Sequence, residues 1–512
     1  MGPHPLVVPV TPTEARPDSG LRRVLRGGVV NMAGAVVSAA LNLALIIAIT
    51  RAFSQETAGL LFSATSVFLI MAAVANLGAP DGLVYFIARM RVFGRQGGVP
   101  ALLRLALGPA MLAACLVSVL LVVFARPLAD ALGPEEATAY LRILALFLPF
   151  AVLTDSALAA TRAHHDMSVT VLVDKVGRPL AQLGLVAMIA LSGSAGLLAL
   201  AWAGPYLPAA VLAWFWLGRI VRRSVPEEPR EPADAPAGTP AGEERVTSAG
   251  FWSFSLPRAL GGVAQMGVQR GGVVMVALLN GLTGAAVFTA ATRIMVVGQF
   301  GTQAVLYAAQ PRFAELLAAR DHAAVRALYQ AGTSWLVCLT WPLYLSALVF
   351  APEVMKLFGA EYSTGATALV IVCAGQLAAQ VLGMGDLILT MTGRTGLNLL
   401  NNVMSLLVNV VVCVLLVPSH GAAGAAAALV AAVLIRKFLP LWQLRSLVLL
   451  HPFSRPVLIA TGSALVWFAA LPLLLDAVTG GGLPALAAAA GAGVGGHLYT
   501  VWHTRAHLQL RR

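Results

Sequence analysis

The sequence predicts an all-α integral membrane protein with about 14 transmembrane helices, built as two pseudo-symmetric six-helix bundles plus two C-terminal helices. Composition is the first reason: 59% of the residues are hydrophobic and 11% are charged, whereas soluble domains have about 25% charged residues. The second is that apolar stretches recur from Gly27 to Val501, each long enough to cross a hydrocarbon core about 30 Å thick. The third is a partial repeat of polar patterns in the two halves.

Each apolar stretch predicts one helix. The second helix is expected to continue past its break at Gly78 and Pro80 to Ala88, because neighbouring helices can satisfy the backbone groups that a proline frees. The predicted segments are 27–50, 57–80, 101–124, 138–160, 168–191, 195–218, 252–280, 284–310, 328–351, 363–392, 397–417, 421–444, 456–476 and 482–501.

Basic residues give the orientation. The net charge is +12, but most Lys and Arg residues fall in alternate loops, on the side of the N-terminal tail. This placement excludes a nucleic-acid surface and, by the positive-inside rule, puts both termini in the cytoplasm. We therefore expect a multi-pass protein of the bacterial cytoplasmic (inner) membrane. The first 20 residues lack the apolar core of a signal peptide.

The middle of the chain contains a polar segment that divides it. Residues 222–250 carry five prolines and six acidic residues and almost no large apolar ones, which is typical of a disordered cytoplasmic linker. The predicted organisation is an N-terminal tail (1–26), an N-terminal bundle (27–221), the linker (222–250), a C-terminal bundle (251–445), and two additional helices with a cytoplasmic tail (446–512).

Two polar patterns recur at an interval of six helices. Asn31, Ser38 and Asn42 in the first helix have the same spacing as Arg258, Gln265 and Gln269 in the seventh. Asp155 precedes Thr161 by the same interval as Asp386 precedes Thr392. An even offset preserves orientation, so the repeat predicts a pseudo-twofold axis along the membrane normal.

Polar stripes on the seventh and eighth helices predict one wall of a cavity. An Arg facing lipid at mid-depth costs at least about 2.5 to 3.5 kcal/mol, so Arg270 and Arg293 should face protein or a water-filled cavity. The Gln and Thr residues of the stripes have an alternative role as hydrogen-bonding contacts between helices. The candidate substrate-binding residues are Arg258, Arg270, Arg293, Gln265, Gln269, Asn31, Ser38 and Asn42.

Two acidic residues lie near the cytoplasmic ends of the fourth and tenth helices. Asp155 and Asp386 are candidates for a proton or sodium site, and equally for an ion pair with a basic neighbour that acts as a gate. Asp174, Lys175 and Arg178, at the start of the fifth helix, are expected to contact only the membrane interface.

Several absences narrow the function. None of the three lysines, Lys175, Lys356 and Lys437, follows a glycine, so the chain has no GK-type phosphate loop and cannot itself be an ATP-driven pump. The sequence contains no D-x-D pair and no long outer loop, which argues against a membrane glycosyltransferase or polymerase. The four cysteines lie in apolar segments and predict neither a disulfide nor a metal site. We expect no cofactor.

Short motifs resemble the polysaccharide flippases of the Wzx type, within the multidrug/oligosaccharidyl-lipid/polysaccharide exporter superfamily. In the first half they are Arg51-Ala52-Phe53 with Gly59-Leu60-Leu61-Phe62, where Ser54 replaces a frequent glycine, and Asn76-Leu77-Gly78, where Asn replaces a common Asp. In the second half they are Phe358-Gly359-Ala360-Glu361-Tyr362, Thr392-Gly393-Arg394 and Gly421-Ala422-Ala423-Gly424-Ala425-Ala426. The likeness spans about 27–445.

This resemblance implies alternating access, in which a central cavity opens in turn to each side of the membrane. The implied substrate is an undecaprenyl-pyrophosphate oligosaccharide, whose anionic headgroup needs cations in a low-dielectric space. Membrane lipids, a coupling proton or sodium ion, and a polysaccharide polymerase or glycosyltransferases are the implied partners. The alternatives are a cation-coupled multidrug antiporter, typically with twelve helices, and a peptidoglycan lipid II flippase, whose arginine-rich first hairpin is absent here.

Overall fold

A computed structural model describes residues 17–92, 96–164, 166–224, 246–446, 448, 450–479 and 483–504. The side chains of residues 17–33 and of a few other positions near the gaps lie outside this description, and Asn31 is among them. The described residues form helices and no strands. The chain is therefore all-α, as predicted.

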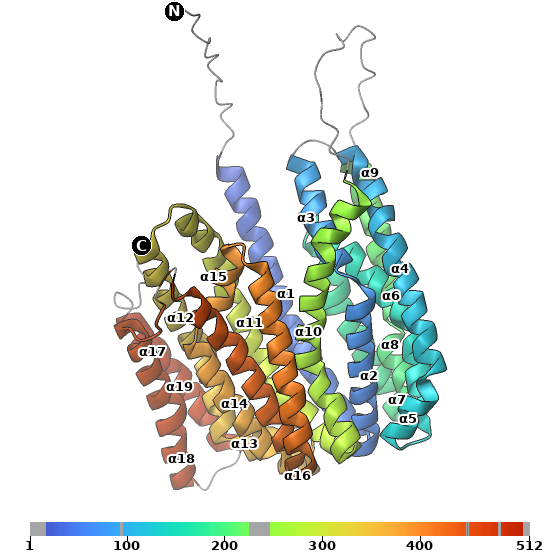
Figure 1. The fold of residues 1–512 in the computed structure, drawn as a ribbon. Helices are drawn as coiled ribbons and strands as arrows, with labels where there is room; N and C mark the ends of the chain where they lie inside the picture. The colour runs from blue at the N-terminus through green and yellow to red at the C-terminus, as the bar shows by residue number, and fades with distance from the viewer. Residues whose placement is uncertain are drawn as a thin grey trace, which may run out of the picture.

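The first half consists of helices that run up and down beside one another (Figure 1). Their bounds are α1 (Pro17–Ala52), α2 (Gln55–Ala75), α3 (Ala79–Val92), η1 (Gln96–Gly98), α4 (Val99–Val123), α5 (Ala125–Leu132), α6 (Glu136–Ala163), η2 (Thr170–Gly177), α7 (Arg178–Ser192), η3 (Ala195–Leu197), α8 (Leu198–Ala203) and α9 (Tyr206–Ser224). The helix α1 begins at Pro17, inside the predicted N-terminal tail.

The second half continues the same architecture. Its helices are α10 (Ser248–Asn280), α11 (Leu282–Ala318), α12 (His322–Val349), α13 (Ala351–Lys356), η4 (Ala360–Gly365), α14 (Ala366–Val381), α15 (Gly385–Met391), α16 (Thr395–Leu444), α17 (Arg455–Leu465), η5 (Val466–Ala470), α18 (Leu471–Thr479) and α19 (Leu483–His503). Residues 225–245 of the predicted linker lie outside the described residues.

The predicted segments correspond to these helices. Eleven helices of the described residues are long and apolar enough to cross a membrane. Three of the 14 predicted segments are not counted separately among these eleven helices. Two predicted segments are joined at a bend in α16, so they count once. The fifth segment is divided between η2 and the short helix α7, and the last segment, α19, is not among the eleven. The chain is a multi-pass membrane protein.

The break in the second segment has a backbone cause. Leu77 and Gly78 both have positive φ angles, 49° and 73°, so the chain cannot continue as one helix and restarts at Ala79. The new helix α3 packs against α6 and α10. The predicted continuation to Ala88 is thus correct in extent, but it is a separate helix.

The two halves contact each other mainly through α10 and α11, which pack against α2, while α10 also packs along α16. At one end of the molecule, Arg51 on α1 donates to the carbonyl oxygens of Leu357 (2.8 Å) and Lys356 (3.2 Å). At the same end, a Cβ on Gly59 would lie 1.9 Å from the carbonyl oxygen of Leu282. The halves are therefore closely packed at this end, which is the outer one in the predicted topology.

Candidate functional site

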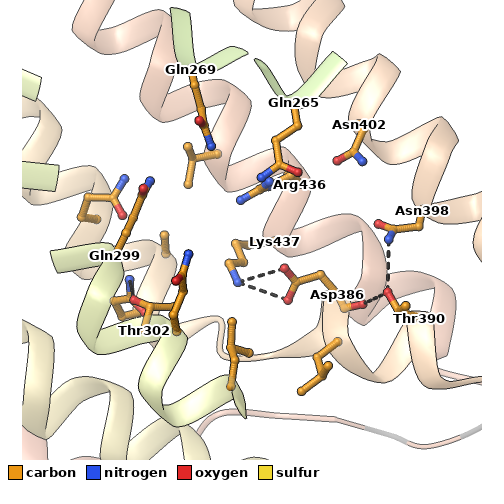
Figure 2. A pocket seen from close by; sticks show the side chains of 17 residues that line it. Gln265, Gln269, Gln299, Thr302, Asp386, Thr390, Asn398, Asn402, Arg436 and Lys437 are labelled. Atoms are coloured by element: carbon orange, nitrogen blue, oxygen red, sulfur yellow. Dashed lines mark hydrogen bonds and ion pairs between the residues drawn. The ribbon is translucent and has the colours of Figure 1, made fainter. Parts of the chain in front are cut away.

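A polar hollow of about 310 Å³ lies among α10, α11, α14, α15 and α16. Amide side chains dominate its lining (Figure 2). They are Gln265 and Gln269 of α10, Gln299 and Gln303 of α11, Gln376 and Gln380 of α14, and Asn398 and Asn402 of α16. Ligand pockets are usually lined predominantly by apolar side chains, so this composition is distinctive. Each amide both donates and accepts hydrogen bonds.

Three charged residues line the same hollow. Lys437 lies 3.2 Å from a carboxylate oxygen of Asp386 and also donates to the carbonyl oxygen of Gly383, at 3.2 Å. The Lys437 side chain is 8% exposed and that of Asp386 is 26% exposed. Arg436 has no hydrogen-bond partner among the described residues, although it interacts electrostatically with Asp386. The charges sum to one net positive charge, which makes the hollow suited to an anionic or neutral polar ligand.

Short hydrogen bonds fix part of the lining. Asn398 donates to the Thr390 hydroxyl at 3.1 Å, and that hydroxyl donates to the carbonyl oxygen of Asp386 at 2.8 Å. On the opposite wall, Gln380 donates to the hydroxyl of Thr302 at 3.1 Å. Side chains held in this way lose less conformational entropy when a ligand binds.

Two further predicted residues, Arg270 and Arg293, form a separate cationic feature on α10 and α11. Neither arginine lines the amide-rich hollow. They are close enough to repel each other electrostatically, and neither has an ion-pair partner in the part of the chain that the structure describes. Arg293 donates from Nε to the carbonyl oxygen of Thr289 at 3.1 Å. Two half-buried guanidinium groups without a carboxylate favour an anion between or beside them.

The other predicted binding residues lie elsewhere. Arg258 is on α10 but lines a different hollow, beside α3 and α6. Asn42 is exposed and donates to the carbonyl oxygen of Ser38 at 2.8 Å, and neither residue lines the amide-rich hollow. The side chain of Asn31 lies outside the described residues. The structure thus brings Gln265, Gln269 and the candidate acid Asp386 together at the amide-rich hollow, and Arg270 and Arg293 together outside it.

The second candidate acid, Asp155, belongs to a polar cluster in the N-terminal half. Its carboxylate accepts a hydrogen bond from Asn76 at 3.1 Å. It also interacts electrostatically with Asp174 and Arg178, which form an ion pair of 2.6 Å. The guanidinium of Arg178 lies 4.6 Å from the centre of the Tyr206 ring and donates to its hydroxyl.

This cluster corrects one sequence-based expectation. Asp174 and Arg178 do not merely contact the membrane interface, because they bond to one another and to Tyr206 inside the N-terminal half. They lie at the π-helical segment η2, and π-helical turns inside helices occur frequently at functional sites. A one-dimensional pattern cannot show this widened turn, which changes the direction in which each side chain points.

Most of the amide-rich hollow is not predicted by the sequence patterns. Gln376, Gln380, Asn398 and Asn402 line it, and so do Arg436 and Lys437. One signal was available: Gln376 and Gln380 are four residues apart in an otherwise apolar helix. Such pairs share a helix face, and a polar face in a transmembrane helix points away from lipid.

Comparisons with known proteins identify the fold. No protein-family profile matches the chain, and no curated protein sequence matches it significantly. A structure of the lipid II flippase MurJ in an inward closed conformation aligns with a TM-score of 0.70 at 11% identity, covering 94% of this chain and 100% of that one.

Two transporters of the MOP superfamily also align. An inward-facing multidrug resistance transporter of the MATE family has a TM-score of 0.64 at 16% identity, covering 82% of this chain and 98% of that one. A transporter from Pyrococcus furiosus has a TM-score of 0.55 at 17% identity, with coverages of 83% and 95%. These alignments show that the chain has the fold of MOP-superfamily transporters.

Proposed function

We propose that this chain, a multi-pass membrane protein with the fold of MOP-superfamily transporters, flips lipid-linked oligosaccharides across the bacterial cytoplasmic membrane. The substrate would be an undecaprenyl-pyrophosphate oligosaccharide, moved by alternating access for polysaccharide biosynthesis. The observation that carries the proposal is the amide-rich hollow of the C-terminal half. Eight amide side chains supply donors and acceptors that match sugar hydroxyls, and the neighbouring cations suit a phosphate-linked glycan.

The cations divide into two groups with different roles. Arg436 lies at the hollow, beside the Asp386–Lys437 pair, and would contact the glycan or its first phosphate. Arg270 and Arg293 would hold the pyrophosphate, because a planar guanidinium can bond two phosphate oxygens at once. The polyprenyl tail would remain in the bilayer, since its burial in a polar hollow would be unfavourable.

A multidrug antiporter is the second candidate, and Asp155 favours it. This exposed acid is hydrogen-bonded to Asn76 and is not held in a direct ion pair among the described residues, so it could exchange a proton or sodium ion. The amide-rich hollow argues against it, because a pocket with one net positive charge repels cationic drugs. The MurJ and MATE alignments show the same fold and support the two candidates equally.

The test is translocation by purified protein in liposomes. We expect the protein to flip a short-chain polyprenyl-pyrophosphate oligosaccharide and to leave cationic dyes untransported. Arg293→Lys should retain partial activity because it keeps the charge, whereas Arg293→Ala should lose nearly all of it. Arg126→Gln, which changes an exposed arginine on α5, is the matched control and should transport normally.

Protein abundance and melting temperature separate the two explanations for a loss of activity. An inactive Arg293→Ala protein with normal abundance and melting temperature supports a ligand role for Arg293. Loss of folded protein in parallel with activity would instead indicate a structural role. Dye efflux that disappears in Asp155→Asn would favour the antiporter and contradict the proposal.

A further inference from the structure

A second hollow, of about 820 Å³, lies between the two halves where α3, α6 and α10 meet. It is separate from the amide-rich hollow, and its lining includes three arginines: Arg89 on α3, Arg162 on α6 and Arg258 on α10. Of the acidic residues that the structure describes, Asp81 alone lines it with them. We call this the α3 hollow.

One face of α3 opens into the α3 hollow. Asp81, Val84, Tyr85, Ala88 and Arg89 are all exposed and are spaced as one stripe on a helix. The opposite face is buried, with Leu83, Phe86 and Ile87 in the core. Asp81, near the start of α3, and Arg89, near its end, therefore both face the α3 hollow.

Aromatic stacking holds the arginine on the other wall. The Arg258 guanidinium lies 3.7 Å from the centre of the Phe254 ring, and its Nη1 donates to the carbonyl oxygen of Phe254 at 3.0 Å. Phe254 is itself stacked on Tyr85, with ring centres 4.2 Å apart and an angle of 22° between the rings. The remaining N–H groups of Arg258 have no hydrogen-bond partner among the described residues, so they are available to a ligand.

The charge of the α3 hollow matches a pyrophosphate diester. Three arginines and one aspartate leave two net positive charges, and a pyrophosphate diester carries two negative charges at neutral pH. Asp81 interacts electrostatically with Arg258 and Arg162, so it acts as an internal anion for these arginines. A bound ligand anion would take over this role.

We propose that the α3 hollow is a second binding site, specific for phosphate-ester anions, in which Arg89, Arg162 and Arg258 bind the pyrophosphate of a lipid-linked substrate before it reaches the interior. Its role in loading that substrate rests on the proposed function, whereas its capacity to bind pyrophosphate does not. The exposed ring of Tyr85, which lines the α3 hollow, provides an apolar surface on which a sugar ring can pack.

The position of the α3 hollow fits a loading role. It lies toward the end of the molecule where α3 and α9 end and α10 begins (Figure 1), which is the cytoplasmic end in the predicted topology. Lipid-linked sugars made on the cytoplasmic face would meet this end first. The arginines also come from both halves, so one ligand would contact both parts that move in alternating access.

Inorganic pyrophosphate is the direct probe, titrated calorimetrically into the full-length protein in phosphatidylcholine nanodiscs. Arg258→Gln and Arg162→Gln should each weaken binding by about tenfold, because each removes a charge-assisted hydrogen bond to the anion. Asp81→Asn should strengthen binding severalfold, since it removes the competing internal anion. Arg126→Gln is the control and should bind as the wild type does.

The gain in Asp81→Asn is decisive, because misfolding does not produce tighter binding. Unchanged affinity in both Asp81→Asn and Arg258→Gln would overturn the proposal. Phosphatidylglycerol added to the nanodiscs tests the source of the anion. If this lipid competes with inorganic pyrophosphate for the site at comparable affinity, the site binds a membrane lipid headgroup and the loading role is overturned.

A wild-type protein that binds pyrophosphate at this site but does not flip lipid-linked sugars would refute the proposed function and leave the site standing. Conversely, active flipping that is unaffected by Arg258→Gln at limiting substrate would refute the loading role alone. The two proposals can therefore fail separately.

Discussion

At the scale of single residues, the polar groups of this protein are mostly held by partners within one half of the chain. Lys437 is bonded to Asp386 and to the carbonyl oxygen of Gly383, all in the C-terminal half. The ion pair lies within one half, between Asp386 and its basic neighbour Lys437, and ion binding at Asp386 would require Lys437 to move away.

The Asp386–Lys437 pair can be tested by a double-mutant cycle. Asp386→Asn should lower the free energy of unfolding by about 3 to 5 kcal/mol, because it leaves the buried ammonium of Lys437 without its counterion. Replacing both residues, as Asp386→Asn with Lys437→Met, should recover much of this loss. Thermal unfolding of the purified proteins measures the effect. Equal stability of the single variant and the wild type would show that the pair is not coupled.

At the scale of secondary structure elements, bends and breaks determine where polar side chains point. The helix α16 contains a bend at Gly421, whose φ of 52° and ψ of −128° are not helical. A side chain there would also meet the amide of Asn280, since a Cβ on Gly421 would lie 2.8 Å from its oxygen. The bend turns the chain back so that Asn398 and Arg436, from the two arms of α16, line one hollow.

Gly421→Ala should therefore be destabilising. A non-glycine residue at this positive φ costs of order 1 to 3 kcal/mol, and the contact with Asn280 adds to that cost. Gly396→Ala, in the same element, is the control: it has open space around its Cβ and should be neutral or stabilising by up to about 1 kcal/mol. Melting temperatures of the two variants provide the comparison, and similar values would contradict the assignment of the bend to Gly421.

At the scale of the whole molecule, the two halves are closely packed at the predicted outer end. Arg51 joins α1 to the end of α13 through two carbonyl oxygens, and Gly59 on α2 lies against the backbone of Leu282 on α11. Alternating access requires these contacts to separate when the cavity opens outward. The residues at this closure are thus expected to set the balance between the two conformations.

Gly59→Ala tests that balance. The added Cβ would lie 1.9 Å from the carbonyl oxygen of Leu282, so the helices must separate and the population should shift toward an outward-open conformation. Labelling of a cysteine introduced near the outer end of α2 should become faster, with the native cysteines replaced. Gly184→Ala on α7, where nothing lies within 4 Å, should leave the rate unchanged. Unaltered labelling in Gly59→Ala would show that the outer end closes without this contact.

The sequence by itself determined the class of protein and the approximate positions of its membrane-spanning segments. Bilayer thickness fixes the length of a spanning helix, so a run of apolar residues carries this information locally. The polar stripes placed Gln265 and Gln269 on one helix face because residues three and four positions apart share a face, and both residues line the amide-rich hollow.

Only the tertiary structure decided which polar residues share a site. Gln269, Gln376 and Arg436 line one hollow although each is separated from the next by tens of residues, while Arg258, eleven positions before Gln269 on the same helix, belongs to another. Helix periodicity gives the direction of a side chain relative to its own axis, but it does not say which neighbour that side faces. Which neighbour a helix face meets depends on how the helix is rotated, where it bends and which helices it packs against. These features arise from contacts between distant parts of the chain.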